Sequence, residues 1–482
     1  MLFNTIDFVV FLCVVFALYW YVARNSRKHQ NVLLLLASYF FYACWDWRFL
    51  FLLMFSTLLD QYTGLRMDNA RKEKHRKRWF WLSIVVNLGF LGVFKYYDFF
   101  ALSFAEAISG LGFRVDPWTI NVILPVGISF YTFHGLSYVI DVYKKRIPAE
   151  KSLLDYSVFV SFFPLLVAGP IERATHLLPQ IKAPRVFDMA KAVDGLRQIL
   201  WGLFKKVVIA DNCARFANEI FDNSDVYQGS ALLLGAVFFA FQIYGDFSGY
   251  SDMALGTARL FGIDLLRNFA FPYFSRDIAE FWRRWHISLS SWFRDYLYIP
   301  LGGSKGATWM RVRNTLIIFL VSGFWHGANW TFILWGLLNA LYIMPSILRG
   351  TNRKNMAIVA SGGALHTAKE VLSIAATFGL TVLAWIFFRA ESVTHAFTYL
   401  ADLFTPELFQ WPDFKDRALA LPTVLLTVLF VGIEWIGRHQ QYAIATVFKG
   451  RPWVYRWAFY GVLLAVIFVF AGSTQQFIYF QF

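Results

Sequence analysis

The sequence has little charge and few cysteines for its length. Charged residues make up 16% of the 482 residues, against roughly 25% in soluble proteins, whereas hydrophobic residues reach 58%. A soluble globule of this size would lack the polar side chains needed to cover its surface. Cys13, Cys44 and Cys213 are too few for a disulfide framework and lack metal-ligand spacing. The composition therefore excludes soluble, disordered, fibrous and disulfide-rich classes and indicates an all-α, multi-pass membrane protein.

Several motifs of soluble enzymes are also missing. The sequence has no glycine-rich phosphate loop, GxSxG elbow, HExxH or CxxC. A zinc site is poorly supported, because His286 and His326 lie forty residues apart without a nearby thiol. We expect no bound metal and no bound cofactor.

The positive charge is explained by topology. Lys and Arg number 45 against 31 Asp and Glu, a net charge of +14. In membrane proteins such an excess accumulates in cytoplasmic loops. We therefore expect a lipid bilayer, and not nucleic acid, as the partner.

Uncharged runs recur along the whole chain. Together with a weaker segment at 199–210, they predict about eleven to thirteen membrane helices, some of them short, broken or re-entrant. No internal repeat or long linker divides the chain, so we expect one polytopic domain over residues 1–482. The runs are 8–23, 31–45, 49–59, 80–94, 117–140, 156–171, 226–245, 314–347, 371–388, 418–433 and 457–482. Run 314–347 is long enough for one long or two short crossings, and the mixed segment 172–215 is expected along the membrane interface.

Basic loops predict the orientation. Lys and Arg gather at 24–28, 66–78 and 144–146, with few in the loops between them. This alternation places the three loops in the cytoplasm and the N-terminus outside, after a retained first span. The basic segment 438–456 predicts that the last span leaves the C-terminus outside as well.

His326 is the clearest polar residue at membrane depth. It lies inside the uncharged run 314–347, beside Ser322, Gly323 and Gly327. An ionisable residue at this depth is costly and suggests function. The alternative is a buried histidine that bonds a neighbouring helix, with small residues that only allow close packing.

A second polar segment spans residues 280–296. Arg283, Arg284 and His286 stand among tryptophans, with serines following. Such groups could grip a phosphorylated or thioester-bearing donor. An interfacial segment is the alternative, since Trp and Arg favour the headgroup boundary.

A third polar set lies in segment 242–252. Gln242, Asp246 and Tyr250 are spaced four apart, so they share one helix face. We expect Asp246 to pair with one of the arginines of the second segment, in a structural network or a catalytic one.

These residue types suit acyl transfer. A histidine without a metal or a nucleophilic serine motif can act as general base, because its ordinary pKa of ~6.5 is close to working pH. His326 would remove a proton from a hydroxyl that attacks an activated acyl group. A thioester would supply the driving force.

Six motifs follow one another along the chain: LPVGISFY at 124–131, AGPI at 168–171, DFSGYSDMA at 246–254, EFWRRWHISLS at 280–290, RDYLY at 294–298 and WHGANW at 325–330. In these motifs the chain resembles the membrane-bound O-acyltransferase (MBOAT) family, in its bacterial alginate O-acetylase-like branch. The resemblance covers most of the first 340 residues, with a core at about 117–347, whereas residues 345–457 carry no family motif.

The resemblance implies a site and a fold. The family's catalytic histidine matches His326, its second polar position, near the cytoplasmic side, matches His286, and we expect both histidines to be catalytic residues. Its fold is a helical bundle with a central funnel and re-entrant or interfacial segments. Candidate donor- or substrate-binding residues in the three segments are Arg283, Arg284, Trp285, Asp246, Tyr250, Gln242, Trp325 and Asn329.

The resemblance also implies the reaction. An acyl group, acetyl with acetyl-CoA as donor, passes from a cytoplasmic thioester towards an extracytoplasmic polysaccharide of the alginate, cellulose or peptidoglycan type. The protein would lie in the bacterial inner membrane, with a periplasmic SGNH-type acetyltransferase or polysaccharide-synthesis proteins as partners. The alternative within the family is D-alanyl transfer to teichoic acid from a carrier-protein thioester.

Two classes outside the family stay open. A proton-coupled transporter would also use intramembrane His, Asp and Arg, although the inverted repeats common in such carriers are not seen. A structural subunit would not need His326.

Overall fold

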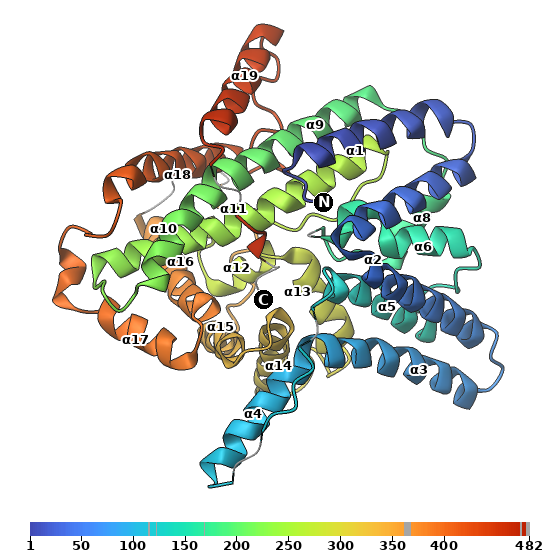
Figure 1. The fold of residues 1–482 in the computed structure, drawn as a ribbon, viewed down its shortest axis with the longest axis horizontal. Coiled ribbons are helices and arrows are strands. Elements are labelled where there is room, and N and C mark those ends of the chain that lie inside the picture. Colours follow the sequence, from blue (N-terminus) through green and yellow to red (C-terminus); the bar gives the residue numbers. More distant parts are fainter. Residues whose placement is uncertain (114–115, 122, 168, 361–367, 473–474, 479–482) are drawn as a thin grey trace. The chain divides into compact units, whose positions relative to one another are not determined.

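The computed structural model describes residues 1–113, 116–121, 123–167, 169–360, 368–472 and 475–478 (Figure 1). All regular elements in these residues are helices, as the composition predicts. The helices include four short π-helical stretches, each a continuation of an α-helix.

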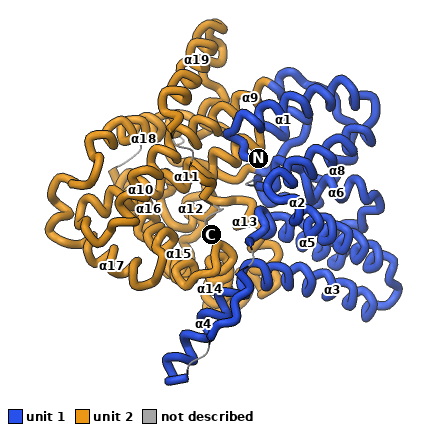
Figure 2. Tube along the Cα trace, viewed as in Figure 1, with its two compact units in different colours: residues 1–192, 257–266 blue, residues 193–256, 267–482 orange. Residues whose placement is uncertain are grey.

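The described chain forms two compact units that interleave in sequence (Figure 2). Unit 1 consists of residues 1–192 and 257–266, and unit 2 of residues 193–256 and 267–482. No long linker separates them, and the expected single membrane domain stays a prediction. All the candidate site residues belong to unit 2.

Unit 1 contains the first eight α-helices. Their bounds are α1 Ile6–Ala17, α2 Arg27–Asp68, α3 Glu73–Leu91, α4 Tyr97–Gly110, α5 Ile128–Tyr143, α6 Leu153–Ser161, α7 Phe163–Leu166 and α8 Ala174–Lys182. Helix α2 is kinked at Asp46, whose backbone is extended (φ −156°, ψ 110°). The kink separates the runs 31–45 and 49–59 that the sequence shows as two segments.

The short helices η1 Leu18–Val22 and η2 Gly92–Tyr96 also belong to unit 1. Unit 2 holds all later helices, apart from the ends of α9 and α11 that fall in unit 1. Their bounds are α9 Met189–Phe204, η3 Lys205–Ala210, α10 Asp211–Asp222, α11 Ser230–Leu260, η4 Pro272–Phe274, α12 Ile278–Arg284, α13 Ile287–Phe293, η5 Arg294–Tyr298, α14 Thr308–His326, α15 Trp330–Leu348, α16 Ala368–Arg389, α17 Val393–Leu403, η6 Pro406–Phe409, α18 Arg417–Gly437 and α19 Trp453–Val469.

Five helical segments of the described chain are long and apolar enough to cross a membrane. They are Glu73–Gly110, Ser230–Leu260, Trp330–Leu348, Ala368–Arg389 and Arg417–Gly437. Two shorter apolar helices are also present, Ile6–Val22 near the N-terminus and Trp453–Val469 near the C-terminus. The protein is therefore a helical, multi-pass membrane protein, and the larger expected number of spans stays a prediction.

The long run 314–347 folds as two helices that pack very closely. Helices α14 and α15 meet at Gly323 and Gly336. A Cβ atom on Gly323 would lie 2.3 Å from the carbonyl oxygen of Phe332, and one on Gly336 would lie 2.3 Å from that of Phe319. Only glycine allows two backbones to approach this closely. His326 is the last residue of α14, directly before the connection to α15.

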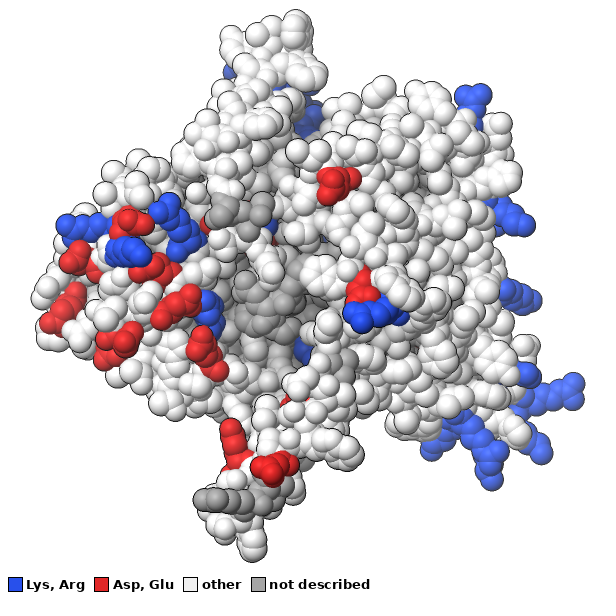
Figure 3. Space-filling view, viewed as in Figure 1, with Lys and Arg blue, Asp and Glu red and all other residues white. Residues whose placement is uncertain are grey.

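Basic side chains gather along the right of Figure 3. Arg66, Arg71, Lys72 and Lys74, around the connection from α2 to α3, are exposed. Arg76 is instead buried and donates to the carbonyl oxygens of Val142 and Tyr143 at the end of α5. Two of the three predicted cytoplasmic loops, those following α2 and α5, therefore meet at one end of unit 1.

Candidate active site

His326 is the last residue of α14, where the helix stops against a glycine. Gly327 is extended (φ −161°, ψ 156°), and Asn329 then caps α15 by accepting a hydrogen bond from the backbone N–H of Thr331 at 3.0 Å. Asn is one of the residues preferred at the N-terminal cap of a helix. The break between α14 and α15 therefore holds the imidazole directly before α15, which is a candidate membrane span.

Aromatic rings surround the His326 imidazole, which is only 4% exposed. The ring centroids of Trp325, Trp335 and Phe388 lie 4.9, 5.1 and 5.3 Å from that of His326. These rings shield the imidazole from water.

His286 sits at the junction of two short helices. It follows α12 and caps α13 with a left-handed backbone (φ 44°), which is uncommon for a residue other than glycine. Its imidazole is 1% exposed and packs edge-on to Phe247 of α11, with centroids 4.7 Å apart. This segment lies outside the candidate membrane spans, and burial lowers the pKa of His286 to about 3.

Asn268 holds His286 in place. The two side chains are joined by a hydrogen bond of 2.9 Å between Nδ1 of His286 and Oδ1 of Asn268. The same oxygen accepts from the hydroxyl of Ser288 at 2.9 Å, and the backbone carbonyl of Asn268 accepts from the N–H of Ile287 at 2.9 Å. Nε2 of His286 has no hydrogen-bond partner among the residues that the structure describes.

Trp325 stands between the two histidines. Its ring centroid lies 6.1 Å from that of His286 and 4.9 Å from that of His326. The polar segments 280–296 and 323–330, which the sequence singles out separately, are therefore brought together around one indole. Trp285 lies in the same core, 1% exposed, with its ring 5.0 Å from that of Trp385.

The two arginines before His286 are engaged by protein groups. Arg283 donates to the carbonyl oxygens of Asn352 and Asn355, both at 2.8 Å. Arg284 forms an ion pair of 2.7 Å with Glu280, which is also paired with Arg276. Arg284 also donates to the carbonyl oxygen of Ala357. The two arginines thus attach α12 to segment 352–357.

The polar face of α11 forms as predicted, but with a different partner. Asp246 pairs with Lys206 of η3 at 2.8 Å and not with one of the arginines of segment 280–296. The reason is the close approach of α9, η3 and α11, where a Cβ on Gly249 would lie 2.7 Å from the carbonyl oxygen of Gly202. Gln242 and Tyr250 are also buried.

Comparison with known proteins identifies the family. Residues 142–362 match the family model described as MBOAT, membrane-bound O-acyltransferase family. A probable alginate O-acetylase of Pseudomonas aeruginosa is 39% identical over 90% of this chain and 80% of its own length. The chain belongs to the membrane-bound O-acyltransferase family. It is an O-acyltransferase, as its motifs predict.

Two further relatives show where the chain lies within the MBOAT family. The peptidoglycan O-acetyltransferase of Helicobacter pylori is 33% identical over 100% of this chain and 98% of its own length. The teichoic acid D-alanyltransferase of Bacillus subtilis is 29% identical, but over only 46% of this chain and 58% of its own length. The chain is therefore similar to O-acetyltransferases along most of its length and to a D-alanyltransferase in part.

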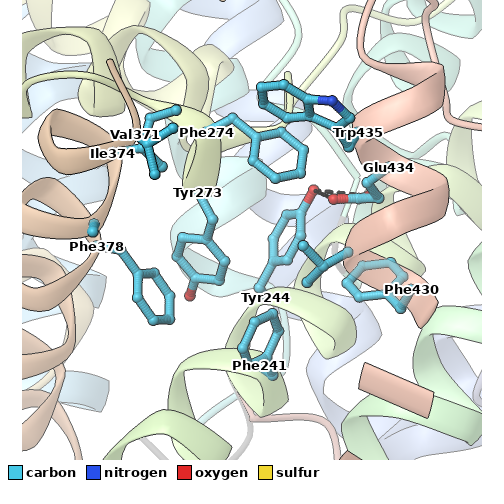
Figure 4. A pocket seen from close by; sticks show the side chains of 12 residues that line it. Phe241, Tyr244, Tyr273, Phe274, Val371, Ile374, Phe378, Phe430, Glu434 and Trp435 are labelled. Carbon is cyan, nitrogen blue, oxygen red and sulfur yellow. Dashed lines mark hydrogen bonds between the residues drawn. The ribbon is translucent and has the colours of Figure 1, made fainter. Parts of the chain in front are cut away.

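A cavity of about 370 Å³ opens in unit 2 of this MBOAT protein, and neither histidine is among its lining residues (Figure 4). Figure 4 shows Tyr244 pointing at Glu434, to which it donates a hydrogen bond of 2.8 Å. The other lining side chains are apolar or aromatic: Phe241, Tyr273, Phe274, Val371, Ile374, Ala375, Phe378, Phe430, Val431 and Trp435. Helices α16 and α18, both candidate membrane spans, supply most of the lining. A coenzyme thioester with several phosphates does not suit these walls.

Asn268 is the site residue that sequence reasoning missed. It lies in the segment between α11 and η4, outside the motifs. Its contact with His286 depends on this segment folding back eighteen residues later, and no periodicity signals such a contact. Asn329, a candidate substrate-binding residue, caps α15 in the structure, and its contact with substrate stays a prediction.

Proposed function

We propose that this protein transfers an acetyl group from a cytoplasmic thioester, acetyl-CoA, to a hydroxyl on the outer side of the membrane, with His326 as general base. The observation that carries the proposal is the pairing of two buried histidines around Trp325. The similarity to acetylases over most of the chain supports acetyl as the group transferred.

The chemistry needs only a base and a positioned donor. His326 accepts the proton of the attacking hydroxyl, whose oxygen forms a bond to the carbonyl carbon of the thioester. The carbon–sulfur bond then breaks, and the proton passes from the imidazolium to the leaving thiolate. The base is thereby restored. The aromatic surroundings of His326 exclude water, which would otherwise hydrolyse the thioester.

The acceptor is proposed from the relatives. We propose a polysaccharide of the alginate or peptidoglycan type, with the acetyl group passed directly or through the serine of a periplasmic SGNH-type partner. Similarity to D-alanyltransferases is confined to about half of the chain. This is the reason to prefer acetyl over D-alanyl transfer.

We propose the direction of transfer from the basic loops. The bias of Lys and Arg supports a cytoplasmic position for the loops at 24–28 and 66–78, with both termini outside, in a protein of the inner membrane. In the proposed route the donor approaches from the cytoplasm past Arg283, Arg284 and His286, and the acceptor approaches His326 from outside.

Sealed membrane vesicles test both donor and direction. Radiolabelled acetyl-CoA is added outside inverted vesicles and, separately, outside right-side-out vesicles, each with polysaccharide acceptor on the opposite side. We expect labelled acceptor only in the inverted vesicles, with none from vesicles that carry His326→Ala and full labelling from Gly379→Ala, a substitution into open space. Equal labelling in both orientations contradicts the direction. Labelling only from a D-alanyl carrier protein contradicts the donor.

A further inference from the structure

We propose that Asn268 is a positioning residue that fixes the tautomer of His286, so that Nε2 is presented as a hydrogen-bond acceptor for an N–H, O–H or S–H group of the substrates. The role of this tautomer in the reaction rests on the proposed function. The tautomer itself can be measured without any acetyl transfer. In this role His286 is a neutral hydrogen-bond acceptor, and not a cation that binds a phosphate.

Asn268 contacts His286 and the two residues that follow it, and these contacts together form a clamp on His286. Its Oδ1 faces Nδ1 of His286 at 2.9 Å and the hydroxyl of Ser288 at 2.9 Å. Its backbone carbonyl accepts from the N–H of Ile287. Asn268 is 1% exposed and His286 is 1% exposed, so water does not compete for these bonds. The clamp maintains the left-handed backbone of His286 at the start of α13.

The orientation of the Asn268 amide follows from a backbone donor. The N–H of Ser288 points at the same side-chain atom of Asn268 at 3.4 Å. A backbone N–H can only donate, so the atom it faces is the amide oxygen and not the amide nitrogen. An amide oxygen can only accept, and Nδ1 of His286 must therefore carry the hydrogen. In a neutral imidazole the lone pair is then on Nε2.

The surroundings of His286 keep it neutral. Three rings contact it: Phe247 from α11, Phe269 from the segment before η4, and Trp325 from α14. None of these rings titrates, and burial disfavours the charged imidazole, which is why its pKa lies far below the ordinary value. Nε2, the atom without a partner among the described residues, is thus an acceptor over the whole physiological pH range.

The full-length protein in lipid nanodiscs, with ¹⁵N-labelled histidine, tests the tautomer directly. The His286 signals are assigned by their loss in His286→Gln. We expect a lone-pair nitrogen at Nε2 and a protonated nitrogen at Nδ1 in the wild type, and averaged signals in Asn268→Ala. A protonated Nε2 in the neutral wild-type imidazole overturns the proposal. This readout stays valid even if acetyl transfer itself is disproved.

Asn268→Asp supplies the functional readout. The carboxylate keeps the acceptor at Oδ1 but adds a negative charge, which raises the pKa of His286. Acetyl transfer by this variant should equal that of the wild type at high pH and fall as the pH drops through the raised pKa, because His286 then becomes protonated. Asn268→Ala should lose about 10–100-fold, as is typical when the orienting partner of a functional histidine is removed.

Asn223→Ala and Asn223→Asp are the matched controls. Asn223 is exposed after α10 and donates to the carbonyl oxygen of Glu219. Both controls should transfer acetyl at the wild-type rate with an unchanged pH profile. If Asn268→Asp shows the wild-type pH profile while folded, or if Asn268→Ala keeps full transfer, Asn268 does not act through His286 and the proposal fails.

Discussion

Nζ of Lys206 lies 2.8 Å from Oδ1 of Asp246 in the interior of unit 2, with side-chain exposures of 1% and 3%. Asp211 lies 2.7 Å from the same ammonium group, and the N–H of Ile478 donates to the other oxygen of Asp246 at 2.7 Å. The pair therefore joins η3, α11 and the last described residues of the chain. Buried ion pairs of this kind are costly to break from one side.

Asp246→Asn should destabilise the protein because it leaves the Lys206 charge with less compensation in a buried site. The expected loss is about 3–5 kcal/mol in the free energy of unfolding. Thermal unfolding in detergent, followed by the loss of soluble protein, measures it. Arg417→Ala is the control, since the Arg417–Asp413 pair is exposed and worth about 1 kcal/mol or less. An unfolding midpoint of Asp246→Asn equal to that of the wild type would show that the pair is not a structural joint.

Gly323→Ala should impair transfer by separating α14 from α15. The added methyl would lie 2.3 Å from the carbonyl oxygen of Phe332, and His326 stands three residues further along α14. A displacement of about 1 Å at a reacting group can cost about 10²-fold in rate. Acetyl transfer per inserted protein molecule measures the loss.

Gly379→Ala is the matched control for that change. It is also a helical glycine, in α16, and its Cβ would meet nothing within 4 Å. Replacing glycine by alanine in a helix with open space is neutral or stabilising by about 0.5–1 kcal/mol. Equal transfer by both variants would argue that the α14–α15 contact does not position the site.

The orientation of the chain is testable by cysteine labelling. Cys13 and Cys44, both exposed, are first replaced by serine. A membrane-impermeant thiol reagent should then fail to label Ser26→Cys and Asn69→Cys in intact cells and label both after lysis, because their loops are basic. Leu111→Cys, after α4 on the predicted outer side, should react in intact cells. Labelling of Ser26→Cys and Asn69→Cys in intact cells would reverse the orientation.

The sequence alone singles out the two histidines as candidates, and their roles stay a prediction. His326 stands out because an uncharged run surrounds it, and the structure places the break between α14 and α15 directly after it. His286 stands out through its charged and aromatic neighbours, and the structure brings it to Trp325. The all-helical class followed from composition, since a chain this apolar needs a bilayer.

The partners of the polar groups could not be predicted in the same way. Residues 205 and 206 lie in a segment expected at the membrane interface, yet Lys205 and Lys206 are buried and pair with Asp252 and Asp246. A pattern shows which residues share a helix face, but which opposite charge meets them depends on how the helices pack. Asn268 escaped notice for the same reason, because its role exists only through a contact with a distant residue.

Transfer by His326→Ala and His326→Gln, measured with labelled acetyl-CoA in inverted vesicles and normalised to the amount of inserted protein, tests the central claim most directly. Loss of a general base typically costs about 10²–10⁴-fold, so both variants should be nearly inactive while inserted and as abundant as the wild type. His286→Gln should lose less, because His286 is an acceptor beside the site and not the base. Turnover at the wild-type rate by either His326 variant, or disappearance of the folded protein in both, would contradict the assignment of His326 as the base.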